Sequence, residues 1–200
     1  VVGVWNVEDG SRRSTVTGAP APRVAVSPDR DVVAVASERG FPIVLRDLSS
    51  GAELASFDVP NGWLDDITWS PDGSVMALAY EAGEGSVVVV LDRSMNVLAE
   101  TRLAGQFVSR ISIHHDNTRV AIARGGRTRF DPVTDSAIVW DWRRDEVVMT
   151  LDEVASIVEF DPTSDLLAGV RMNGASPVVW NARTGERIVE LTGHAGLVGD

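Results

Sequence analysis

The sequence predicts an all-β protein made of repeated four-stranded units. A turn motif recurs in "VAVSPDR" (24–30), "ITWSPDG" (67–73), "ISIHHDN" (111–117) and "VEFDPTS" (158–164), with its third turn position 43 to 47 residues apart. A second anchor, an Asn or Asp that closes an apolar run, recurs at positions 6, 47, 92, 141 and 181. No stretch shows a sustained apolar period of 3.6 residues, so long amphipathic helices are not expected.

Each unit reads as four short strands. In the second unit, "DDITWS" and "SVMALAY" flank a tight turn, and "SVVVVLD" and "VLAETRL" follow. Valine, isoleucine, threonine and tryptophan dominate these runs, as in half-buried strands. Four strands about every 40–45 residues are the signature of a β-propeller blade. We therefore expect a β-propeller with four consecutive four-stranded antiparallel blades at about 22–59, 63–103, 107–152 and 155–193.

Finer boundaries follow from the same anchors. The innermost strands should lie near 23–27, 65–70, 109–113 and 156–160. Residues 1–7 and 12–18 read as the third and outer strands of an earlier blade, and "GLVGD" begins another inner strand, so partial blades are expected at both ends. In the "SPDG" turn, Pro71 suits the first corner and Gly73 tolerates a positive φ.

The motifs resemble those of the WD-repeat β-propeller family over essentially all 200 residues. The matching residues are the "SPD" turns at 27–29 and 70–72, Trp5-Asn6, Trp140-Asp141, Trp180-Asn181, the "TGE" turn at 184–186 and Gly193-His194. The repeats are degenerate, because Arg46 and Leu91 stand where the family has tryptophan. The resemblance implies a buried structural role for His194. It also implies that the family's His–Ser/Thr–Asp–Trp network is absent or rebuilt here.

The blade count predicts one propeller segment over residues 1–200. Propellers close with four to eight blades, and the family that this chain resembles typically closes with seven. Four blades with partial blades at the ends are therefore expected to form an arc of a larger ring. A closed ring of four or five blades is the alternative.

The composition restricts the classes of partner that this chain is expected to bind. The net charge is −11, with 29 acidic and 18 basic residues, whereas a surface that neutralises nucleic-acid phosphates needs a basic excess. Apolar runs are far shorter than the ~18 residues of a membrane span. There is no cysteine, and every basic residue is arginine, which is typical of a GC-rich bacterial genome. We expect a cytoplasmic location, with no direct nucleic-acid or membrane partner and no small-molecule substrate.

The sequence offers little catalytic chemistry. His114-His115-Asp116 looks like a metal or acid–base cluster, but it occupies a turn position of the third unit. Adjacent residues at a strand end point to opposite sides, so we expect no metal there. There is no Ser-His-Asp arrangement, phosphate-cradling glycine loop or paired acid motif, so we expect no enzyme and no cofactor.

The best candidates for binding are aromatic and arginine residues in loops. The segment 124–136 combines Arg124, Arg127, Arg129 and Phe130, and Trp63 and Phe107 precede inner strands. Such residues dominate interface energies. We expect Trp63, Phe107, Arg110, Arg127, Arg129 and Phe130 to share one end of the propeller and to bind a partner there. The alternatives are a tolerated surface insertion for the loop and a plug between blades for each aromatic.

These observations favour a non-catalytic interaction or scaffold module that binds a protein, a peptide or another domain of its own chain. The resemblance implies a larger bacterial regulatory protein as its parent. The alternative is a gating propeller of a multidomain enzyme, because prolyl oligopeptidase-type propellers also use "SPDG" turns.

Overall fold

The computed structural model describes residues 2–6, 8–16, 22–37, 42–60, 62–125, 136–152, 157–170 and 176–193. Within these ranges the chain forms eighteen strands, β1–β18, and no helix. Accordingly, none of the described segments is a helix long and apolar enough to cross a membrane. The predicted all-β fold is confirmed.

Sixteen of the strands form four antiparallel four-stranded sheets, the blades of a β-propeller, in chain order. Blade 1 contains β3 (Pro22–Val26), β4 (Val32–Ser37), β5 (Ile43–Asp47) and β6 (Glu53–Phe57). Blade 2 contains β7 (Leu64–Trp69), β8 (Val75–Glu81), β9 (Gly85–Asp92) and β10 (Val97–Ala104). Blade 3 contains β11 (Phe107–Ile113), β12 (Arg119–Gly125), β13 (Ser136–Asp141) and β14 (Glu146–Asp152). Blade 4 contains β15 (Ile157–Phe160), β16 (Leu166–Val170), β17 (Val178–Asn181) and β18 (Arg187–Glu190).

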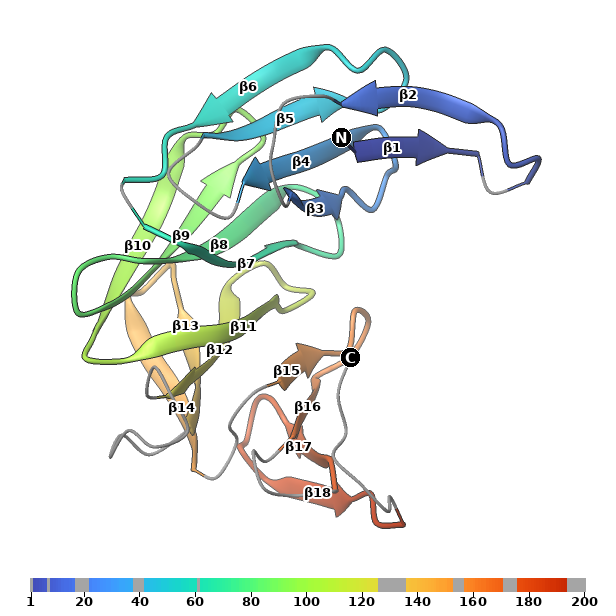
Figure 1. The fold of residues 1–200 in the computed structure, drawn as a ribbon. Coiled ribbons are helices and arrows are strands. Elements are labelled where there is room, and N and C mark those ends of the chain that lie inside the picture. The colour runs from blue at the N-terminus through green and yellow to red at the C-terminus, as the bar shows by residue number, and fades with distance from the viewer. Residues whose placement is uncertain are drawn as a thin grey trace.

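The blades follow one another as an open arc (Figure 1). Contacts between blades run through the innermost strands, from β3 to β7, from β7 to β11 and from β11 to β15. A two-stranded sheet of β1 (Val2–Trp5) and β2 (Arg12–Val16) precedes blade 1, as expected for a partial blade. The inner strands start within two residues of the predicted positions.

Burial explains why the central strands are apolar on both faces. In β9, Val87, Val89 and Leu91 pack in a core shared with blade 1. Val88 and Val90, which alternate with them, pack in a core shared with blade 3. Because successive side chains point to opposite faces of a sheet, one strand serves two interfaces. A third core between blades 3 and 4 includes Phe160 and Trp180.

The recurring Asn and Asp anchors are turn residues. The side-chain oxygens of Asn6, Asp47, Asp92, Asp141 and Asn181 each accept the N–H of the residue two positions later, at 2.8–3.1 Å. Each anchor thus closes the turn between the third and fourth strands of a blade. Their spacing in the sequence reflects this shared task.

The "SPD"-type turns join the first and second strands. The N–H groups of Ser27, Ser70, His114 and Asp161 each donate to the carbonyl five residues later, at 2.9–3.0 Å. These four residues are therefore equivalent positions of the four blades. Gly73 has a φ of +69°, as predicted from the sequence, while Arg30 and Asn117 adopt positive φ at the same position in blades 1 and 3.

Side chains also link neighbouring blades at their inner strands. Trp69 Nε1 donates to the Ala25 carbonyl at 3.0 Å, and the Ile111 N–H donates to Asp66 Oδ2 at 2.8 Å. The Phe160 N–H donates to Ser112 Oγ at 3.0 Å. An inner strand has one edge without a neighbouring strand, so these bonds pair backbone groups of that edge.

Candidate functional site

The strands alternate in direction, so each blade has two kinds of end. The turns after the first and third strands lie at one end, which we call the turn end. The connections after the second and fourth strands lie at the opposite end, which we call the loop end. The predicted binding residues were expected at the loop end.

Trp63 and Phe107 do lie at the loop end. Trp63 directly precedes β7, is 39% exposed, and accepts the Glu81 N–H on its carbonyl at 2.8 Å. Phe107 is the half-buried first residue of β11 and pairs in register with Gly125. Each aromatic residue stands seven positions before the turn residue of its blade, Ser70 or His114. Trp63 and Phe107 therefore hold equivalent positions in blades 2 and 3.

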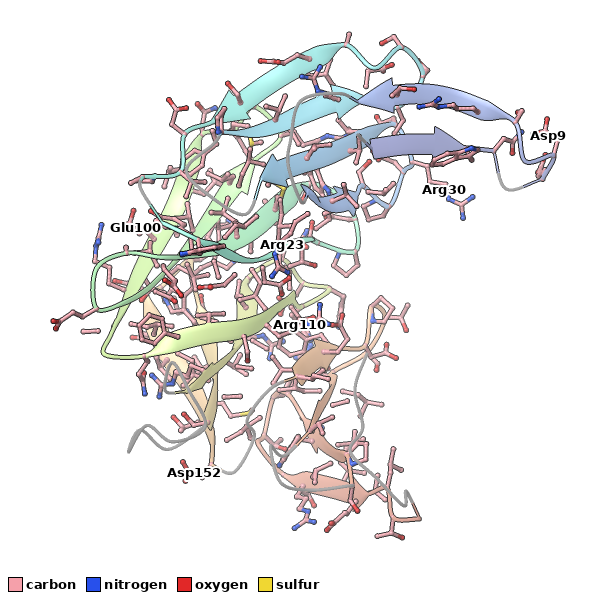
Figure 2. All side chains as sticks on the ribbon, viewed as in Figure 1. Asp9, Arg23, Arg30, Glu100, Arg110 and Asp152 are labelled. Atoms are coloured by element: carbon pink, nitrogen blue, oxygen red, sulfur yellow. The ribbon has the colours of Figure 1, made fainter. Side chains whose placement is uncertain are left out.

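Arg110 lies elsewhere. It belongs to the middle of β11, an inner strand, and not to a loop, so its expected place at the rim is wrong. A register shift between Val108 and Arg110 marks a β-bulge that displaces the strand by one residue. The Arg110 guanidinium lies 3.9 Å from the Asp66 carboxylate. In Figure 2, the labelled Arg110 and Arg23 lie beside the inner strands of the arc.

The remaining predicted binding residues, Arg127, Arg129 and Phe130, fall outside the described residues, as does His194. Their place at the loop end stays a prediction. Arg124, at the start of the same segment, is described within β12. Its guanidinium donates to Gln106 at 2.7 Å and to Ser136 at 3.3 Å, and burial lowers its pKa. Arg124 thus holds the β10–β11 connection against blade 3.

The inner strands carry a charge pattern that was not identified from the sequence. Arg23, Asp66 and Arg110 each stand four residues before the equivalent turn positions of blades 1, 2 and 3. These three residues therefore form a row of charges of alternating sign across the inner strands β3, β7 and β11. Burial raises the pKa of Asp66, while the Ile111 N–H and Arg110 act in the opposite direction. Aligning the turns in the sequence would have revealed this register.

Asp65 is the most perturbed carboxyl of this region. A β-bulge in β7 places it between Leu64 and Asp66, outside the regular pairing. Its Oδ2 accepts the Ser86 hydroxyl at 2.9 Å. Burial raises the pKa of Asp65 to about 7, with Glu81 and Asp66 adding to the rise and Ser86 opposing it.

The described polar groups are arranged as structural networks. Ser86 donates to Asp65 and accepts the Val108 N–H at 3.1 Å, so both functions of its hydroxyl are engaged. His114 and His115 face carboxylates and not a hydroxyl. Within the described ranges, we therefore find no activated nucleophile of the serine–histidine type.

The two histidines contradict one step of the sequence argument. Their ring centroids are 4.1 Å apart, so the side chains lie on the same side and not on opposite sides. The reason is that β11 ends at Ile113, so both histidines belong to the following turn and escape the alternation of a strand.

A hollow of about 200 Å³ opens at the loop end, between the β8–β9 and β10–β11 connections. It is lined by Ala82, Glu84, Gly85, Ser86, Val87, Arg102, Leu103, Ala104 and Gly105. A Cβ on Gly85 would come within 2.2 Å of the Leu103 carbonyl oxygen, so this wall requires glycine. Pockets for small molecules usually exceed about 300 Å³, so this hollow suits a single side chain of a partner better.

Comparisons with known proteins bear on the fold. No family model matches the sequence, and no curated protein matches it. Solved structures match in large number, 922 chains, so likeness in fold does not select one function. One of them is Kuenenia stuttgartiensis hydrazine synthase, with a TM-score of 0.72 and 16% identity. The match covers 92% of this chain and 57% of that chain, and at this identity it shows a shared fold alone.

Proposed function

We propose that this chain is a non-catalytic interaction module, a WD-repeat-type propeller segment of a larger bacterial regulatory protein in the cytoplasm. Its loop end binds a protein, a peptide or another domain of the same parent chain. In this proposal the blades form the scaffold, and the aromatic and arginine residues of the loops provide specificity.

The observation that carries this proposal is the exposure of Trp63 on a rigid support. A tryptophan that is 39% exposed keeps apolar surface in water, although its backbone is fixed by the bond from Glu81. Ala82, the residue after Glu81, lines the neighbouring hollow. An exposed aromatic anchor beside a recess of side-chain size is typical of the centre of an interface.

The test uses the chain as bait to isolate partners, followed by affinity measurements with a purified partner. Trp63→Ala should weaken binding about 5- to 150-fold, equivalent to about 1–3 kcal/mol, and leave the melting temperature nearly unchanged. Arg129→Ala should act in the same direction. Trp5→Ala is the matched control, because Trp5 is 57% exposed but lies near the turn end, in β1.

Two results would count against the proposal. If Trp63→Ala lowers the melting temperature without changing affinity, the indole is a plug between blades. If neither Trp63→Ala nor Arg129→Ala changes binding, the loop end is not the interface. The gating propeller of a hydrolase remains supported by the "SPDG" turns alone, and a GxSxG elbow in flanking sequence would favour it.

A further inference from the structure

A second site lies at the turn end, between blades 3 and 4. His114 and His115 come from the turn after β11, and Asp165 comes from the turn before β16. One ligand atom from each residue lies within 4.8 Å of the other two. His114 Nε2 is 3.1 Å and His115 Nε2 is 3.9 Å from the same oxygen, Asp165 Oδ1.

The three side chains are held in place by their surroundings. His114 is fully buried and packs edge-on against Phe160, with 4.9 Å between ring centroids. Arg183 binds the other carboxylate oxygen of Asp165 at 2.6 Å, so Oδ1 faces the histidines. His115 Nε2 is buried and has no hydrogen-bond partner. A buried imidazole nitrogen without a partner is costly, and a metal ion would satisfy it.

The neighbours of His114 suit a ligand role. Its Nδ1 lies 3.0 Å from Asp116 Oδ1. Histidine that binds a metal through one ring nitrogen usually donates the other N–H to a carboxylate, which fixes the tautomer. The Asp116 N–H also donates to Nδ1 at 3.2 Å, so metal binding selects the other tautomer, in which Nδ1–H is donated to Asp116 Oδ1 and the lone pair of Nε2 points toward the space next to Asp165.

Arg119 is the competing cation. Its guanidinium is bound to Asp116 at 2.7 Å and to the Ala182 carbonyl at 2.9 Å. The same guanidinium nitrogen that binds Asp116 approaches Asp165 only to 3.4 Å. That nitrogen is 3.1 Å from Nδ1 and 3.3 Å from Nε2 of His114. The same nitrogen therefore competes with a metal ion for the ring nitrogens of His114 and for Asp165 Oδ1, and it must move aside for the ion to bind.

We propose that His114, His115 and Asp165 bind a divalent transition-metal ion of the Zn²⁺ class through two imidazole nitrogens and one carboxylate oxygen, across the junction of blades 3 and 4. Two nitrogens and one oxygen, completed by water, match the ligands that Zn²⁺ prefers. Small movements of His115 and Arg119 bring the donors to bonding distance. The positive charges of Arg119 and Arg183 keep the affinity moderate, because they repel the ion.

The experiment is titration of the tag-free chain with ZnSO₄ by calorimetry and with CoCl₂ by visible absorption. The wild type should bind one ion, and His115→Ala should weaken binding by about tenfold or more. Arg119→Gln should tighten it, since the competing charge is removed. His194→Ala is the control and should bind like the wild type, because positions 114, 115 and 194 hold every histidine of the chain.

Several results would overturn the proposal. These are an absence of saturable binding by the wild type, unchanged binding by His115→Ala, or loss of binding in His194→Ala alone. If Arg119→Gln fails to fold, the comparison of His115→Ala with His194→Ala still shows whether the metal ion binds at His115. His115 is partly exposed in a turn, so its replacement should leave the fold intact.

Discussion

At the residue scale, irregular strands give adjacent residues unlike environments. Asp65 and Asp66 are neighbours in β7, yet the bulge directs Asp65 to Ser86 and Asp66 to the backbone of blade 3. Asp66 accepts the Ile111 N–H at the edge of the inner strand β11 and lies near Arg110. Burial of Asp65, in contrast, raises its pKa to about 7. Because of this one-residue bulge, Asp66 forms a hydrogen bond between blades 2 and 3, whereas the neighbouring Asp65 is a buried carboxyl with a pKa of about 7.

Asp65 should make stability depend on pH. The free carboxyl has a pKa near 3.8, and the folded one about 7, so the folded state binds more protons between these values. The contribution of Asp65 to stability is therefore full below pH 4 and is lost as pH rises through 7. Asp65→Asn should raise the free energy of unfolding at pH 8 by about 1–2 kcal/mol and have little effect at pH 4. Urea denaturation at both pH values measures this.

The control for Asp65→Asn is Asp58→Asn, which replaces an exposed carboxyl in the connection between blades 1 and 2. Its stability relative to the wild type should not change between the two pH values. Equal effects of Asp65→Asn at pH 4 and pH 8 would show that the burial of Asp65 does not control its ionisation.

At the element scale, each blade is a meander whose turns are fixed by one anchor residue. Asp47 is the strongest example, because its Oδ1 accepts the N–H groups of Ser49 and Ser50 and both of their hydroxyls. Asn6 and Asn181 serve the same turn in other units. The turn therefore needs an acceptor oxygen and not a negative charge.

Replacing Asp47 tests this requirement. Asp47→Ala removes the acceptor and should lower the free energy of unfolding. Asp47→Asn keeps one acceptor oxygen and should cost less than half as much. Thermal and urea denaturation of the two variants measure the difference. An equal loss in both variants would mean that charge, and not the hydrogen-bonded turn, provides the stability.

The sequence predicts elements well because a blade is a local structure. Strands, turns and anchors such as Asp47 and Gly73 depend on neighbours within a few residues, so the inner strands could be located within two positions. The bulges at Asp65 and Ser109 could not, because they depend on the packing of one blade against the next. Two errors have a local cause: Arg110 was expected at the rim although it lies within the predicted inner strand 109–113, and the histidine rings were expected apart because His114 and His115 were treated as strand residues and not as turn residues.

At the scale of the whole molecule, stability depends on bonds between residues far apart in the sequence. At the turn end, Arg93 binds Asp29 at 2.5 Å and Asp31 at 2.8 Å, and Asn117 donates to Asp72 at 2.6 Å. Different side chains thus link blades 1 and 2 and blades 2 and 3. No local pattern predicts such pairs, since each partner is chosen by the register of separate blades.

The bond from Phe160 to Ser112 should couple blade 4 to blade 3. Ser112 is buried, and its hydroxyl accepts the Phe160 N–H at 3.0 Å and donates to Glu159 at 3.2 Å. Ser112→Ala leaves a backbone donor of β15 without this partner, which should cost about 1–3 kcal/mol.

Amide hydrogen exchange should localise that loss, because proteins open in cooperative units whose stabilities differ. In Ser112→Ala, amides of β15–β17 should exchange faster, while those of β8 and β9, which pack between blades 1 and 3, should change less. Thr68→Val is the matched control, since Thr68 occupies the equivalent position of blade 2 and its hydroxyl bonds locally to the Trp69 carbonyl at 3.5 Å. Thr68→Val should leave the exchange of β11 nearly unchanged. If amide exchange in Ser112→Ala becomes faster to the same extent in all four blades, the prediction is wrong. That result would mean that the described arc opens as one unit and that the bond from Phe160 to Ser112 does not set the stability of the junction between blades 3 and 4.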